Sequence, residues 1–530
     1  MKDEYPAQIS VGECTVTVTD SRGKGKDELY AAKRAKVATA KEVSEPLTVG
    51  NFYGVLSAQV DSVSVRTNET DFAGILENGL PQLASVSFTA TSADKLSAKV
   101  TVAGKKYSLK NGSWVAETNG FRICRLEASG IALELALAGG QAPADWKTAG
   151  GAAVLTMDVP DAKTGGWQYG IVYRGELFRD NSKVQAYYDE IAAQFAGYYT
   201  VALKPAAVDY SGGMPLAPAG NGYIGITIDS KGKAKLSGKL ADGTKISQSA
   251  NACAIRYDGA AGAPALYVPV YASKTSYCFG GTLRLYRKTI DVKKPDGTMA
   301  NLDPFRADFD TVVDSTTNTV GNLVWNEDDA KLSYEGLSGW QLSVVPVGGW
   351  YDTVFNLQAY YKAYALQLDA PLIEAFPAQD LPEGFAFVDI ESAQPKNVPV
   401  AFAGNTIAVP KKTIAKESGI VNFQDSVNPC ELKIKFKRAT GVLSGSFKLW
   451  AESEDKQKTV GSVKHEGILL LQRDGSGTLE DSVLSAGFIN YATKVSRDVD
   501  YDAKTGKYKA RKWTLSLPFN LRGEDQSTGE

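Results

Sequence analysis

The sequence contains a single histidine, His465, among its 530 residues. Zinc and non-haem iron sites usually draw on several imidazole ligands, so one histidine excludes most metallohydrolase centres. A Ser-His-Asp triad would have to use His465, but no G-x-S-x-G motif leads into a predicted helix. We therefore predict no catalytic residue, no metal site and no bound cofactor, and we expect His465 to lie on a strand face.

Cysteine is also scarce, and the five cysteines form no C-x-x-C pair. Metal knuckles and thioredoxin-type redox motifs are therefore absent. Cys253 and Cys278 fall in segments that could form adjacent strands of a hairpin bent around residues 262–264. A disulfide between them is compatible with strand spacing and would suit an exported protein. Two buried thiols are the alternative.

Long hydrophobic runs and a strong net charge are both missing. No apolar stretch reaches the roughly 20 residues that a membrane helix needs, so we expect no membrane span. The 58 basic and 60 acidic residues give a net charge of −2, which argues against nucleic acid as a partner. No hydrophobic signal segment follows Met1. The Thr-, Ser-, Gly- and Tyr-rich strands nevertheless lead us to expect an extracellular or cell-surface location.

The composition that is present favours strands and tight turns, with 51 Gly, 25 Tyr and 19 Phe. Three stretches, which begin at Ser85, Gly222 and Glu431, share one pattern. Each has an alternating strand, a short polar turn, the series Leu-Ser-small, a second strand and another turn. The series reads Leu96-Ser97-Ala98, Leu236-Ser237-Gly238 and Leu443-Ser444-Gly445. Recurring units of this kind indicate an array of similar β domains.

The sequence thus predicts an all-β fold of three tandem antiparallel meander β-barrel or β-sandwich domains with a short bridging helix. We expect an N-terminal strand or arm at 1–46, β domains at 47–185, 186–365 and 366–515, and a frayed C-terminal tail at 516–530. Residues 7–20 alternate with period two and predict one strand of the arm. Apolar residues at helical spacing predict the bridging helix over Asp180–Phe195, packed against the second β domain.

Aromatic residues are the most suggestive recognition feature. Trp340, Trp350 and Tyr351 cluster near the end of the second β domain. A row of rings can stack on sugars, which makes these three residues a possible glycan-binding site. The alternative is that they cap the barrel core and seat the next domain.

The order of the hairpin patterns resembles repeat modules of large secreted proteins from the Verrucomicrobia, Planctomycetes and Lentisphaerae group. The matching segments include SVSFTATSADKLSAKVTVAGKKYSL, GYIGITIDSKGKAKLSGKLADGTKIS and LKIKFKRATGVLSGSFK, within about Gly50 to Tyr491. The resemblance implies extracellular β-barrel or sandwich repeats beside adhesive or carbohydrate-related domains. It brings no catalytic residue with it.

We therefore expect a non-enzymatic, exported or cell-surface β-repeat protein that acts in adhesion, surface assembly or glycan contact. Its expected partners are copies of itself joined by strand pairing, other surface proteins or glycans. The alternative is a carbohydrate-active enzyme or its carbohydrate-binding accessory module. Glycosidases need two nearby carboxylates, and Asp389 and Glu391 would lie on one strand face, although such an outward pair is usually only solvated.

Overall fold

The computed structural model describes residues 5–11, 14–20, 49–58, 64–65, 83–92, 95–118, 121–128, 130–138, 150–160, 167–180, 195–211, 214–250, 254–258, 263–274, 277–287, 291–293, 299–301, 307–311, 323–327, 340–351, 364–378, 381–471, 483–495, 501–502, 504–508 and 511–525. Within these ranges the regular structure consists of β strands and short 3-10 helices, which confirms the predicted all-β fold class. The helix predicted over Asp180–Phe195 falls, except at its two end residues, outside the described residues.

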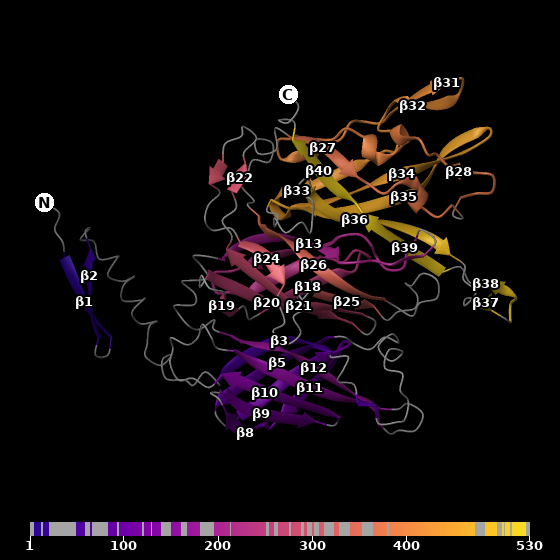
Figure 1. Cartoon of the computed structure of the whole chain (residues 1–530). Helices are drawn as coiled ribbons and strands as arrows, with labels where there is room; N and C mark the ends of the chain where they lie inside the picture. Colours follow the sequence, from indigo (N-terminus) through magenta and orange to yellow (C-terminus); the bar gives the residue numbers. More distant parts are fainter. Residues whose placement is uncertain are drawn as a thin grey trace.

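Three large antiparallel sheets follow one another along the chain and stack as a column (Figure 1). The first sheet, in indigo and purple, lies at the bottom of the view, and the third, in orange and yellow, lies at the top. Their strands cover residues 50–179, 197–350 and 364–525. The column therefore follows the order of the sequence.

The first sheet has the order β7-β6-β5-β3-β12-β11-β10-β9-β8, with β4 beside β12. Along the chain, the first strand (β3) pairs with the last (β12), and the other neighbours are consecutive in sequence except that β4 lies between β3 and β5 and pairs with β12. The sheet curls so that β7 comes into contact with β9. We call the gap between the two edge strands, here β7 and β8, the seam of the sheet, because these two strands are not paired with each other among the described residues. Its strands are β3 (Gly50–Ala58), β4 (Ser64–Val65), β5 (Leu83–Ser92), β6 (Lys95–Val102), β7 (Lys105–Lys110), β8 (Ser113–Thr118), β9 (Phe121–Ala128), β10 (Ile131–Ala138), β11 (Gly150–Pro160) and β12 (Trp167–Arg179).

The second sheet repeats this arrangement in the order β18-β17-β16-β13-β26-β24-β21-β20-β19, with β25 beside β21 and β26. The Gln248 side chain spans the seam, since its Nε2 donates to Pro269 O (3.3 Å) and its Oε1 accepts from Tyr271 N (2.7 Å). The strands are β13 (Gly197–Pro205), β16 (Gly222–Ile228), β17 (Ala234–Lys239), β18 (Lys245–Ala250), β19 (Ala254–Asp258), β20 (Ala263–Ser273), β21 (Tyr277–Arg287), β24 (Ala307–Thr311), β25 (Leu323–Glu327) and β26 (Trp340–Trp350).

The third sheet has the order β27-β40-β36-β35-β34-β28, with β33 beside β34 and β39 beside β36. Its strands are β27 (Tyr364–Asp369), β28 (Ala386–Phe387), β33 (Lys433–Lys437), β34 (Val442–Ser453), β35 (Lys456–Leu469), β36 (Val483–Val495), β39 (Arg511–Pro518) and β40 (Asn520–Asp525). The prediction of a frayed tail at 516–530 is therefore wrong for residues 516–525. Leu517 and Leu521 are buried there and anchor these strands in the core.

Several hairpins form sheets of two strands only. They are β1 (Tyr5–Val11) with β2 (Cys14–Asp20), β14 (Tyr210–Ser211) with β15 (Met214–Pro215), β22 (Asp291–Lys293) with β23 (Met299–Asn301), β29 (Ala401–Ala403) with β30 (Thr406–Ala408), β31 (Thr413–Glu417) with β32 (Ile420–Val427), and β37 (Tyr501–Asp502) with β38 (Lys507–Tyr508). The single strand expected at 7–20 is thus replaced by a hairpin, because the chain reverses between Val11 and Cys14.

The three stretches that share a pattern form the same local structure. Each is an antiparallel meander, namely β5-β6-β7, β16-β17-β18 and β33-β34-β35. The leucine of each Leu-Ser-small series lies on the middle strand and is buried. The small residue two positions later faces the same side, and in Gly238 and Gly445 an added Cβ would overlap a carbonyl oxygen of the neighbouring strand. Close strand approach explains why this position is small.

The second and third sheets share one hydrophobic core. A single buried cluster includes Val347 and Ala202 of the second sheet together with Phe488, Val483 and Leu470 of the third. In contrast, a small buried cluster of Phe178, Ala265 and Tyr267 joins the first sheet to the second. In both junctions the preceding sheet contributes its first strand and the first strand of its meander: β3 and β5 contact β20 and β21, and β13 and β16 contact β35 and β36.

Hydrogen bonds reinforce the junction between the second and third sheets. Tyr223 donates through its hydroxyl to Glu466 Oε2 (2.9 Å), and Lys239 forms an ion pair with the same carboxylate. Burial, with the nearby Glu466 charge, raises the pKa of Tyr223 well above its usual range. The main chain takes part as well, since Ala219 N donates to Ser516 O (3.0 Å). The junction therefore resembles a domain interior rather than a linker contact.

Candidate functional site

The three aromatic residues predicted to bind sugars do not form one cluster. Trp340 and Trp350 occupy the two ends of the 11-residue strand β26, which at about 3.3 Å per residue sets them roughly 30 Å apart. Both rings pack against the core cluster of the second sheet. Tyr351 is 2% exposed, and its hydroxyl donates to Arg438 O (2.7 Å). The rings thus cap the core of the second sheet and anchor the third, as the alternative interpretation expected.

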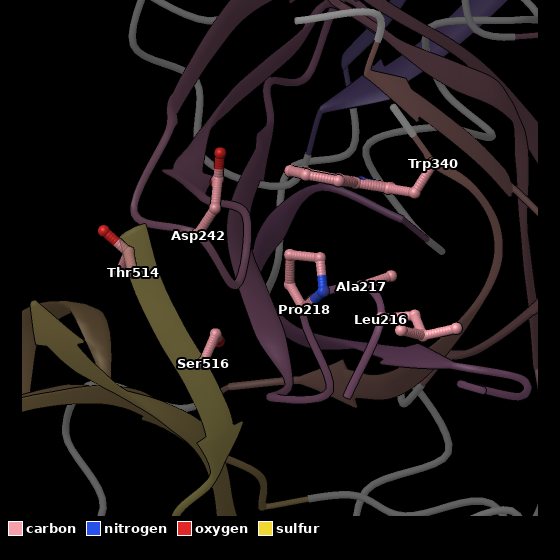
Figure 2. A pocket seen from close by; sticks show the side chains of 7 residues that line it. All are labelled: Leu216, Ala217, Pro218, Asp242, Trp340, Thr514 and Ser516. Atoms are coloured by element: carbon pink, nitrogen blue, oxygen red, sulfur yellow. The ribbon is translucent and has the colours of Figure 1, made fainter. Parts of the chain in front are cut away.

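Trp340 also lines a small pocket at the junction of the second and third sheets (Figure 2). The ring lies above Pro218, while Thr514 and Ser516 project from β39 of the third sheet. The cavity measures about 30 Å³, which is room for about two water molecules and far less than the roughly 300–1,000 Å³ of typical ligand pockets. A sugar ring does not fit there.

The polar groups of this pocket mostly hold the β17–β18 turn in place. Asp242 accepts hydrogen bonds from Thr244 N (2.8 Å) and Thr244 Oγ1 (2.6 Å), and burial raises the pKa of the Asp242 carboxyl. Ser516 Oγ donates to Ala241 O (2.6 Å) across the junction. Trp340 Nε1 is buried without an acceptor among the described residues. The polar groups of the pocket therefore serve to hold the second and third sheets together, and the Trp340 Nε1–H group is a donor without a partner among the described residues.

A larger groove lies nearby, where the segment before β16 crosses the third sheet. Its volume is about 480 Å³, within the range typical of ligand pockets. The groove is lined by Tyr210, Asp369, Ala370, Pro371, Leu372, Glu374, Ala375, Leu517 and Pro518. Tyr210 is 56% exposed and Leu372 is 55% exposed, so two large apolar side chains face solvent in one depression. We refer to these nine residues as the junction groove.

The junction groove contains two carboxylates that differ in their hydrogen-bond partners. Asp369 Oδ2 accepts from Asn520 Nδ2 (3.2 Å) and from Arg522 Nη2 (3.0 Å). In both hydrogen bonds the acceptor is Oδ2, so among the described residues Oδ1 remains able to accept a hydrogen bond from a ligand. Glu374 is exposed in the 3-10 helix η5 (Ile373–Ala375) and has no partner in the described part of the chain. The groove can thus accept hydrogen bonds beside an apolar surface.

His465 lies inside the third sheet. It is 1% exposed, its ring stacks on Phe519 at 4.3 Å, and its Nε2 lies 2.9 Å from Lys433 O. Because a carbonyl oxygen only accepts, Nε2 carries the proton. Burial lowers the pKa of His465 to about 4. The only imidazole of the chain is neutral and sealed from any substrate.

The acidic pair considered from the sequence does not share a strand face. β28 ends at Phe387, and Glu391 begins the 3-10 helix η7 (Glu391–Ala393). Asp389 accepts a hydrogen bond from Gln394 Nε2 (3.3 Å), and both carboxylates are exposed. Within the described residues, no three His, Cys, Asp or Glu side chains gather as metal ligands would.

The predicted disulfide between Cys253 and Cys278 stays a prediction, because Cys253 lies outside the described residues. Cys278 lies on β21, which pairs with β20 and β25. The Cys278 thiol is buried 3.9 Å from Asn326 Oδ1.

Comparisons with known proteins give no family. No family model and no curated protein matches the chain. A solved structure of Trypanosoma rangeli sialidase in complex with sialic acid aligns over 83% of this chain and 89% of its own, with 8% identity and a TM-score of 0.13. That score supports no conclusion about fold or activity. Among the described residues, no helix has the length and hydrophobicity needed to cross a bilayer.

The residues of the junction groove carry no signal in the sequence. Tyr210 belongs to the two-residue strand β14, and Leu372 directly precedes the 3-10 helix η5, about 160 positions further along the chain. Exposed single hydrophobic residues of this kind are ordinary in proteins. Asp369 ends a strand and Glu374 follows in a turn. Only the docking of the third sheet on the second brings them together. Periodicity and motif spacing contain no information on that contact.

Proposed function

We propose that the chain is a non-enzymatic, exported or cell-surface β protein that acts in surface assembly, adhesion or glycan contact. The observation that supports this best is the core shared by the second and third sheets, which joins them into one stiff body. A stiff body with a groove at its junction is suited to hold a binding surface at a fixed distance from the point where the protein is attached. The internal resemblance among the three meanders agrees with a modular surface protein.

The burial of His465 adds support for a non-enzymatic role. A hydrolase built on a serine and a histidine base requires the imidazole within reach of the substrate. Here the ring is stacked on Phe519 and bonded to Lys433 O inside the sheet. Any such chemistry would need the third sheet to open.

A carbohydrate-active enzyme is the second candidate, and the junction groove favours it in one respect. Asp369 and Glu374 place two carboxylates in one groove, and glycoside hydrolysis generally uses such a pair. Asp369 Oδ2 lies 3.0 Å from Arg522 Nη2, and a carboxylate held in an ion pair suits a binding role better than that of a proton donor. Release of reducing sugar from a polysaccharide panel by purified protein, abolished in Glu374→Gln, would establish the enzyme and refute the binding role.

A glycan array and an accessibility assay test the leading proposal. We expect the purified chain to retain one class of glycan without cleaving it. Intact cells of the source organism should be labelled by an antibody to the chain, because an exported protein is accessible without lysis. Labelling only after lysis would contradict the surface location.

Self-assembly through strand pairing is a further part of the proposal. In the part of the chain that the structure describes, β1 and β2 pair only with each other, and open strand edges are templates for strand addition. Light scattering should show fewer copies per particle after deletion of residues 1–46. An unchanged number of copies would remove this mode of assembly.

A further inference from the structure

The junction groove differs from the other exposed apolar positions in one respect. Tyr210 and Leu372 line the same depression and each exposes more than half of its surface. The remaining exposed large hydrophobics of the described chain line neither this groove nor the Trp340 pocket; they are Val115, Phe121, Ile390, Ile420 and Val427. Two such side chains in one groove indicate a surface that a ligand covers.

The walls of the groove are stiff. Pro371 and Pro518 have fixed φ angles, and Leu517 belongs to the buried core of the third sheet. Tyr210 lies in the β14–β15 hairpin, which Leu216 N closes by donating to Asp209 O (2.8 Å). A preformed site loses little conformational entropy when it binds.

The chemistry of the groove is that of an aromatic face beside free acceptors. The phenol ring of Tyr210 offers a negative π face to polarised C–H groups. Glu374 and Asp369 Oδ1 offer acceptors to hydroxyl donors. A pyranose presents both kinds of group, since one face carries C–H bonds and the rim carries hydroxyls.

The charge of the groove limits the class of sugar that can bind. Two carboxylates line the groove; Arg522 pairs with Asp369, whereas the exposed Glu374 has no partner among the described residues. A sialic acid, a uronate or a sulfated sugar would bring a like charge against Glu374, which disfavours binding. A neutral sugar meets no such penalty.

We propose that the junction groove binds a short segment of neutral glycan, with Tyr210 stacked on a sugar ring and Glu374 and Asp369 accepting from its hydroxyls. This inference rests on the proposed glycan contact and adds the site and the ligand class. It replaces the Trp340, Trp350 and Tyr351 cluster as the place of binding.

The full chain is tested on an array that carries neutral oligomers of glucose, galactose, mannose and xylose together with sialylated, uronate-containing and sulfated glycans. The best neutral oligomer is then titrated by calorimetry. We expect Tyr210→Ala to weaken its binding about tenfold or more and Tyr210→Phe to keep it within about twofold. Phe121→Ala, which truncates an equally isolated aromatic of the first sheet, is the matched control and should bind like the unmodified chain.

A second variant tests the ligand class. Glu374→Gln keeps an acceptor but removes a charge, so acidic glycans should gain affinity relative to neutral ones. Thermal unfolding midpoints equal to that of the unmodified chain establish that the exposed Tyr210 and Glu374 variants are folded.

Each failure has its own meaning. Neutral binding that persists unchanged in Tyr210→Ala overturns the groove as the site and leaves the proposed function standing. Preference for acidic glycans overturns the ligand class. No binding to any glycan on the array overturns the inference together with the glycan contact on which it rests.

Discussion

His465 couples the stability of the third sheet to pH. Its pKa is lowered to about 4 in the folded chain because burial disfavours the imidazolium, against an ordinary value near 6.5. Above pH 6.5 the ring is neutral in both states and its contribution is complete. As the pH falls toward 4, the unfolded chain binds a proton that the folded chain does not, so the folded state loses about 3 kcal/mol.

We therefore predict a difference between the chain and His465→Gln in this pH window. Glutamine can still donate to Lys433 O but does not titrate. Urea unfolding at pH 7 and pH 4.5 should show that the unmodified chain loses about 2–3 kcal/mol more than the variant. Carboxylates titrate equally in both proteins and cancel. Equal losses would mean that His465 is not buried as a neutral ring.

Gly445 provides a second test at the residue scale. An added Cβ would overlap Lys433 O and press on His465 Nε2. We expect Gly445→Ala to destabilise the chain by about 2 kcal/mol or more, because overpacking against backbone cannot relax easily. At the equivalent position of the first sheet, Ala98→Gly should cost only about 0.5–1 kcal/mol. Chemical denaturation measures both, and a harmless Gly445→Ala would refute the close approach.

At the scale of elements, one side chain makes hydrogen bonds across the seam of the second sheet, where the edge strands β18 and β19 are not paired with each other among the described residues. Gln248 on β18 bonds to the backbone of Pro269 and Tyr271 on β20. Gln248→Ala leaves both backbone groups without this partner, so we expect a loss of about 1–3 kcal/mol. Hydrogen exchange of Tyr271 N–H should accelerate in the variant, whereas exchange in β3 and β5 should not change. Unaltered protection at Tyr271 would show that the seam closes without Gln248.

The sequence is informative about elements whose evidence is local. The alternation and turn chemistry of each of the three meanders lie within one continuous segment of the chain (residues 83–110, 222–250 and 433–469), and these elements form as predicted. The prediction that residues 516–525 form a frayed tail was wrong, because nothing local to this segment indicates its partners. Its strand β40 pairs with β27 and β36, which lie far away in the sequence. The expected cluster of Trp340 and Trp350 does not form, for a different reason. Both residues belong to one extended strand, which separates residues that are close in sequence.

The junction groove could not be predicted from the sequence, because it depends on packing between sheets. Tyr210 comes from the second sheet's side of the junction and Glu374 from the third. Each is unremarkable within its own segment. Their proximity depends on the docking of the third sheet on the second, whose residues share one buried cluster that includes Val347 and Phe488. No local pattern encodes that docking.

At the scale of the molecule, the shared core predicts that the second and third sheets unfold together. Phe488 is 1% exposed and stacks on Tyr223 with ring centroids 6.3 Å apart. Phe488→Ala should cost about 3–5 kcal/mol. Hydrogen exchange read by mass spectrometry should then show β16 and β36 losing protection to the same extent. Loss confined to β36 would mean that the third sheet unfolds independently.

The two junctions also give the column a direction. Because β3 with β5 and β13 with β16 face the following sheet in both cases, each junction is built from two unlike surfaces. A molecule made in this way has no twofold symmetry along its length, and its two ends are chemically distinct. If one end is fixed to a support, every copy must point its other end outward. A layer of such molecules would therefore present the same face, and its junction grooves at one common height.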